Sequence, residues 1–100
     1  MAQATELHDK FKKTAKEIGE LLVVKNTAYG NSFNTSGEIL RVLYPEGVRP
    51  DQYEDLLAIA RIIDKLYRVA NKKDGKDQMG ESPYLDIVGY SILGTVRDEG

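Results

Sequence analysis

The chain contains no cysteine and a single histidine, His8. The lack of cysteine excludes disulfides, thiolate metal sites and cysteine nucleophiles. One histidine offers no cluster for zinc, and the sequence supports no Ser-His-Asp arrangement. The phosphate-binding patterns G-x-x-x-x-G-K and G-x-G-x-x-G are also missing, so a nucleotide would have to be held by side chains.

Long apolar runs and a basic excess are absent as well. No run approaches the roughly 20 residues that span a bilayer, and the N-terminus has no apolar segment typical of a signal peptide. We therefore expect a cytoplasmic protein without a membrane partner. The net charge of −2 argues against a protein that coats nucleic acid, and no sequence-specific nucleic-acid partner is expected. The length of 100 residues predicts one domain, residues 1–100.

Helical spacing is present in the first third of the chain. Apolar residues recur every three or four positions from Thr5 to about Ala28, which predicts an amphipathic helix; they are Leu7, Phe11, Ala15, Ile18 and Leu22. Gly30 is expected to end this helix in the left-handed conformation. The same spacing continues through Lys25 to Tyr29, so both side chains are predicted to face inward.

Three further helices are expected, and together the four predict a small all-α bundle. The capping-box spacing at 35–38 predicts a short helix of about two turns, ended by the prolines of 44–50. A long helix is predicted from Asp51 to Asn71, then a mobile, exposed loop at 71–81. A last helix should begin with Ser82 as N-cap and Pro83 at its first position.

The predicted core is too small to bury all the apolar residues of the third helix. Leu57, Ile62 and Val69 lie partly outside the main stripe of the third helix; that stripe consists of Leu56, Ile59, Ala60, Ile63, Leu66 and Tyr67. Oligomerisation would bury the additional positions. We therefore expect a homo-oligomer.

Cationic and aromatic side chains lie beside the predicted core. Arg61, Lys65 and Arg68 form a basic arc on the third helix, and Asp64 sits between that arc and the apolar stripe. Cations beside an apolar wall suit a phosphorylated aromatic ligand, because arginine pairs with phosphate and tyrosine stacks on a base. The alternative is a solvated helix face, with Lys25 reaching water past a packed stem and Tyr29 at the core edge.

The last helix carries a related pattern. Asp86, Tyr90 and Arg97 share one edge, next to Gly89. A glycine inside a helix costs about 1 kcal/mol relative to alanine, so Gly89 and Gly94 indicate either room for a ligand or close helix packing. Carboxylates such as the Glu17 and Glu20 pair could in principle bind Mg²⁺, but a solvated face is the favoured interpretation of that pair.

Three segments in this order resemble a known family. The segments KNTAYGNSF, DLLAIARIIDKLYR and GESPYLDIVGYSILG are similar to the K-x-x-x-YG-x-S-aromatic, R-I-x-x-K/R-x-x-R and E-x-x-x-x-DI-x-x-Y pattern of the nucleotide-modification-associated domain family, first type. The resemblance covers residues 21–94 and implies a small all-α phage or prophage protein of nucleotide metabolism or DNA modification. The resemblance implies that the matching positions, together with Asp64, form one ligand-binding site. They are Lys25, Tyr29, Gly30, Ser32, Arg61, Lys65, Arg68, Glu81, Asp86 and Tyr90.

A more distant similarity is to the MazG-like all-α nucleotide pyrophosphohydrolases, whose carboxylates hold Mg²⁺. The spacing of ESPYLD departs from that pattern. The departure favours a binder over a hydrolase, and no cofactor is then expected. Such a protein would sequester a nucleotide or nucleotide-derived signal in the host cytoplasm, as anti-defence phage proteins do. If the chain is an enzyme, Asp64, Glu81 and Asp86 are the candidate catalytic Mg²⁺ ligands. A third hypothesis is an interaction module without a small ligand.

Overall fold

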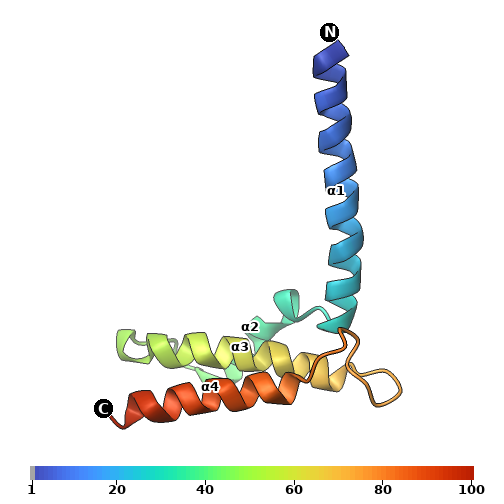
Figure 1. Ribbon diagram of the computed structural model, residues 1–100. Coiled ribbons are helices and arrows are strands. Elements are labelled where there is room, and N and C mark those ends of the chain that lie inside the picture. The colour runs from blue at the N-terminus through green and yellow to red at the C-terminus, as the bar shows by residue number, and fades with distance from the viewer. Residues whose placement is uncertain (1) are drawn as a thin grey trace.

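A computed structural model describes residues 2–100 of the chain (Figure 1). These residues form four α-helices and one short 3-10 helix, with no β-strand beyond an isolated bridge between Lys73 and Lys76. The elements are α1 (Ala2–Ala28), α2 (Ser32–Leu43), η1 (Pro50–Gln52), α3 (Tyr53–Ala70) and α4 (Pro83–Asp98). The predicted all-α fold is confirmed. No helix of the described residues is long and apolar enough to cross a membrane.

The helices that pack together are α2, α3 and α4. α3 lies along α4, and α2 crosses α3 on another side (Figure 1). Ile63 of α3 is the buried apolar residue at the centre of this packing, and Ala28 is buried where α1 ends. Few other side chains are fully enclosed, so the core is smaller than a bundle of this length should provide.

α1 does not join the others, and the expected four-helix bundle is therefore not formed within one chain. Figure 1 shows α1 projecting away from the α3–α4 pair as a separate rod. The apolar stripe that was expected to be buried is solvent-exposed, as Phe11 at 60% and Leu22 at 59% illustrate. The physical reason is the turn at Gly30 and Asn31, which directs α1 away from the surface that it would have to cover.

The start of α2 differs from the prediction. α2 begins at Ser32 and not after a capping box at Thr35. Thr35 already lies inside the helix, where its hydroxyl donates to the carbonyl of Asn31 at 3.1 Å and hydrogen-bonds the hydroxyl of Tyr67 at 2.7 Å. Its hydroxyl is thus used inside the helix, so α2 is a turn longer than the capping pattern indicates.

The limits of α3 and α4 agree with the predictions, whereas α1 begins at Ala2 and not at Thr5. η1 and α3 together span Pro50 to Ala70, and α4 opens with Pro83 directly after an extended Ser82. The loop between α3 and α4 folds around the buried carboxylate of Asp77. It was predicted to be exposed throughout, and for Asp77 that prediction is wrong.

The face of α3 follows the predicted stripe only in part. Ile63 is buried and Tyr67 is half-buried, whereas Leu66 is exposed. Arg68, assigned to the basic arc, is instead one of the most buried side chains of the protein. The two glycines inside α4 do not support the close-packing alternative. A Cβ added at Gly89 or Gly94 would meet nothing within 4 Å, so neither glycine is required for tight helix packing.

Candidate functional site

A groove of about 290 Å³ lies where the end of α1 meets α2 and α3. Four of the predicted site residues line it, from three different segments: Lys25, Tyr29, Ser32 and Asp64. The remaining lining residues are Leu22, Asn26 and Phe33. The groove therefore combines an apolar wall with a cation, a carboxylate and two aromatic rings.

Two consecutive left-handed residues produce this corner. Gly30 has φ +60° and Asn31 has φ +62°, and the N–H of Asn31 donates to the carbonyl of Asn26 at 3.1 Å. A side chain at position 30 would also overlap the amide of Asn71, which donates to the carbonyl of Tyr67 at 2.7 Å. The predicted left-handed glycine is confirmed, and it brings the end of α1 against the end of α3.

Tyr29 stands between two cations of α3. Its ring centroid is 5.8 Å from Nζ of Lys65 and 5.4 Å from Cζ of Arg68. Both distances lie within the range of a cation–π interaction. Tyr29 is half-buried, whereas Lys25 is exposed, and both side chains line the groove.

Arg68 is held in a buried ion pair. Its side chain is 1% exposed and that of Asp77 is 3% exposed, with Nη2 to Oδ2 at 2.6 Å and Nε to Oδ1 at 3.2 Å. Glu81 adds a second carboxylate 3.3 Å from Nη2. The hydrogen bond to Asp77 raises the pKa of Arg68 above its ordinary value, and the same bond lowers the pKa of Asp77. Arg68 therefore has almost no surface to offer a ligand.

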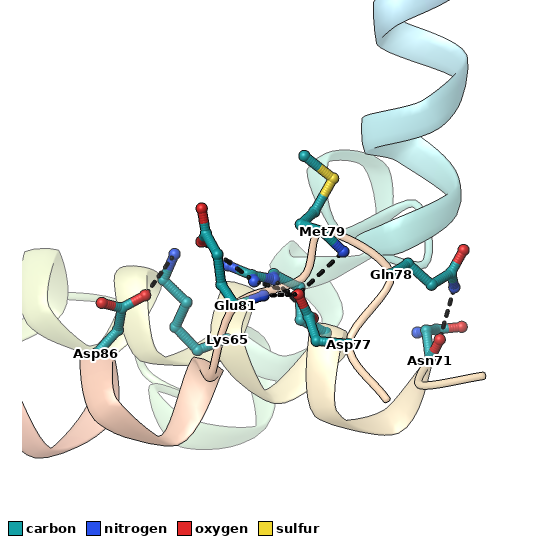
Figure 2. A network of polar contacts seen from close by, with 8 residues as sticks. Lys65, Asn71, Asp77, Gln78, Met79, Glu81 and Asp86 are labelled. Carbon is teal, nitrogen blue, oxygen red and sulfur yellow. Dashed lines mark hydrogen bonds and ion pairs between the residues drawn. The ribbon is translucent and has the colours of Figure 1, made fainter. Parts of the chain in front are cut away.

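The loop around Asp77 completes this network, as Figure 2 shows. Oδ2 of Asp77 accepts the backbone N–H groups of Met79 at 3.0 Å and Glu81 at 3.1 Å. The side-chain amide of Gln78 donates to the carbonyl of Asn71 at 2.6 Å. The bonds from Met79 and Glu81, together with those of Arg68, stabilise the carboxylate of Asp77 in its charged form.

Lys65 of α3 contacts the ring of Tyr29 and keeps some exposure, although it does not itself line the groove. Its Nζ lies 3.3 Å from Oδ2 of Asp86, with 16% of the lysine side chain exposed (Figure 2). Asp86 thus pairs with Lys65, as Glu81 pairs with Arg68. Neither carboxylate lines the first groove.

Arg61 and Tyr90 lie elsewhere. Cζ of Arg61 is 5.8 Å from the ring centroid of Tyr90, and both line a second groove of about 200 Å³ between α3 and α4. The other lining residues are Glu54, Leu57, Ala58, Leu93, Gly94 and Arg97. The sequence placed Arg61 and Tyr90 in one site with Tyr29, but Tyr29 lines the first groove and the other two line the second.

The carboxylates of the hydrolase alternative do not fit a magnesium site within one chain. Asp86 is paired with Lys65, Glu81 contacts Arg68, and Asp64 lines the first groove. Among residues 2–100 no group of three or more histidine or carboxylate side chains is arranged to hold a metal ion. A hard divalent cation needs several oxygen ligands that converge.

Two important residues were not selected from the sequence. Phe33 is 94% exposed and lines the groove beside Tyr29; the aromatic position of the family pattern includes it, so a signal was present. Asp77 was treated as part of a polar loop, and no spacing distinguishes it from its acidic neighbours. Its role follows from burial, which sequence periodicity does not report for a loop.

Comparison with known proteins gives no relative. No protein-family model matches the chain, and neither the curated proteins nor the solved structures contain a match. The resemblance to the nucleotide-modification-associated domain family therefore stays an expectation from three short motifs.

Proposed function

We propose that the protein binds, and thereby sequesters, a phosphorylated nucleotide or a nucleotide-derived signal in the first groove. The observation that carries the proposal is the grouping of Lys25, Tyr29 and Phe33 around one groove with Lys65 beside Tyr29. An exposed aromatic ring can stack on a base, and lysines neutralise phosphates. The volume of about 290 Å³ is at the low end of ligand pockets, which span roughly 300–1,000 Å³, and suits one nucleotide unit.

Each side chain has a distinct part in this proposal. Lys25 and Lys65 contact phosphate, Phe33 and Tyr29 stack on the base, and Asp64 accepts from a ribose hydroxyl. Arg68 acts as a positioning residue, because its ion pair with Asp77 fixes it against the ring of Tyr29.

We also propose that the working form is a homo-oligomer. The radius of gyration is 18.7 Å, whereas a compact chain of this length has roughly 13 Å. The accessible surface is 7963 Å², about 2,300 Å² more than expected for a folded monomer of this mass. A standard interface buries about 800 Å² per partner, so the excess is large enough for one or more such interfaces.

The test is to mix the full chain with a panel of linear and cyclic nucleotides and Mg²⁺, filter it, denature the retained protein, and identify both fractions by mass spectrometry. An intact nucleotide released only on denaturation is the expected result. A shortened nucleotide in the filtrate would show a hydrolase and overturn the sequestering function. An unchanged panel would overturn nucleotide binding and favour the interaction module.

Matched variants localise the binding to the groove. Lys25→Ala should reduce the retained nucleotide about tenfold, because a charge-assisted contact to phosphate is lost. Lys16→Ala, on an exposed part of α1 outside the groove, is the control and should retain as much as the natural chain. Equal retention by both variants would place the ligand elsewhere.

A further inference from the structure

The exposed apolar residues of α1 follow a heptad repeat. Leu7, Phe11, Thr14, Ile18 and Leu21 are separated alternately by four and three residues. The four large members are all about half exposed or more, and the structure packs α1 on no other helix (Figure 1). This spacing is that of the a and d positions of a two-stranded coiled coil, with Phe11 and Ile18 at a and the others at d.

The residues beside this seam carry opposite charges on one side only. Lys10 and Glu17 occupy successive g positions, whereas His8 and Ala15 occupy the e positions on the other side. Lys10 and Glu17 are exposed, and neither forms an ion pair within the described part of the chain. Charges at e and g positions select the partner and orientation of paired helices.

We infer that α1 pairs with the α1 of a second copy of this chain, antiparallel, with Lys10 of each copy opposite Glu17 of the other. In antiparallel pairs the g positions face each other. The register that packs Leu7 on Ile18 and Phe11 on Thr14 places Lys10 opposite Glu17, and the two-fold symmetry repeats that pair.

Other arrangements of the same seam are unfavourable. A shift of one heptad in either direction sets Glu17 against Glu17 or Lys10 against Lys10. A parallel pair would place Lys10 against Ala15 and Glu17 against Leu22, which gives no ion pair. It would also stack Lys25 on Lys25, because Lys25 continues the heptad as an a position. Like charges in close contact destabilise a pair, so charge selects the antiparallel register.

The inference specifies the geometry of the proposed homo-oligomer and does not depend on nucleotide binding. The paired segment runs from Ala4 to Leu21 and stops before Leu22, where the groove begins. Each groove lies beyond the last paired apolar layer, at one outer end of the helix pair.

The test is the dimer dissociation constant of the full chain, measured by analytical ultracentrifugation over a range of concentrations. Lys10→Glu and Glu17→Lys should each weaken the dimer at least tenfold, because each creates two like-charge contacts. The double variant Lys10→Glu/Glu17→Lys should return to within about threefold of the natural chain. Lys16→Glu makes the same charge change on the outward side of α1 and should leave the constant unchanged.

Recovery in the double variant separates pairing from damage to the helix itself. Lys10→Glu places a like charge one turn from Glu6, and Glu17→Lys does the same beside Lys13, so the double variant carries both costs. Positions 10 and 17 are two turns apart in one helix, about 10 Å, which is too far for contact. Only pairing between copies can restore the dimer.

Cysteine cross-linking tests the orientation, since the natural chain has no cysteine. A mixture of Leu7→Cys and Ile18→Cys chains should form a disulfide-linked dimer, and neither chain alone should do so. Self-linking of either variant would overturn the antiparallel arrangement. An oligomer that ignores both charge reversals would overturn α1 pairing alone, and a natural chain that is monomeric throughout would overturn the proposed oligomer as well.

Discussion

The guanidinium of Arg68 and the carboxylate of Asp77 meet at two points, at 2.6 Å and 3.2 Å, although they are nine positions apart in the chain. One face of Arg68 is also covered by the ring of Tyr29. The pair thus connects the α3–α4 loop to the floor of the candidate site, and it makes stability and ligand binding depend partly on the same residues.

Replacing Asp77 by alanine should lower the free energy of unfolding by about 3 kcal/mol, because a buried arginine would lose its main counter-charge. Urea denaturation at fixed protein concentration measures the change. The control is Asp55→Ala, which removes an ion pair of the same 2.6 Å length to Arg97 between partly exposed side chains. Its cost should stay below about 1 kcal/mol, and equal costs for the two variants would contradict the structural role of burial.

Stability should fall in acid and be flat near neutrality. The pKa of Asp77 is lowered in the folded protein, and an unfolded aspartate titrates near about 3.9. The stabilisation is therefore complete above that value and is lost as pH falls through the lower folded pKa, since the unfolded chain takes up the proton first. Unfolding measured from pH 7 to pH 2 should show this loss, and Asp77→Asn should reduce it.

The pKa of Arg68, by contrast, is raised. While Asp77 is ionised, its contribution is present up to the ordinary arginine value, and on the alkaline side it would decline only in strong alkali. No dependence on Arg68 titration is therefore expected between pH 5 and pH 9, and a slope in that range would have to come from another group.

Gly30→Ala should destabilise the protein by about 2 kcal/mol, because a left-handed backbone is unfavourable for alanine and the methyl group would overlap Asn71. Gly89→Ala is the matched change in open space within a helix, and it should stabilise by up to about 1 kcal/mol. Thermal unfolding of both variants checks the pair. A neutral Gly30→Ala would mean that the corner between α1 and α2 relaxes without cost.

Phe33→Ala should separate binding from folding. The ring is almost fully exposed, so its removal should change the free energy of unfolding by no more than about 0.5 kcal/mol. Nucleotide affinity should fall about tenfold, since stacking of a base on an aromatic ring contributes roughly 1–3 kcal/mol. Val42→Ala, another exposed apolar residue of α2 outside the groove, should alter neither quantity when both are measured by calorimetry.

The helices could be predicted from the sequence because periodicity and glycine or proline signals are local. Gly30, Ser82 and Pro83 fixed their boundaries close to the observed ones. Local sequence does not show which surface covers an apolar stripe. Leu22 was therefore predicted to be buried and is exposed, whereas Arg68 was assigned to a surface arc and is buried. A basic residue at the edge of a stripe has the same spacing whether it faces water or a buried carboxylate.

The candidate site was predicted in part for the same reason. Lys25, Tyr29 and Ser32 are close in sequence and stay close in space, and Asp64 joins them because the turn after α1 sets Tyr29 against α3. Arg61 belongs to a different groove, since its pairing with Tyr90 is decided by how α4 lies along α3. That packing depends on the whole interface and not on the helix that carries Arg61.

The separation of α1 from the other helices also makes protection from hydrogen exchange uneven along the chain. Residues of α3 around Ile63 are enclosed by packing, so their amide hydrogens can exchange only through large openings of the structure. In a single chain the amides of α1 have only their own helical hydrogen bonds to slow exchange, and an isolated helix is barely stable in water. Protection of α1 therefore becomes a local measure of its association, with dilution releasing these amides while those near Ile63 stay protected.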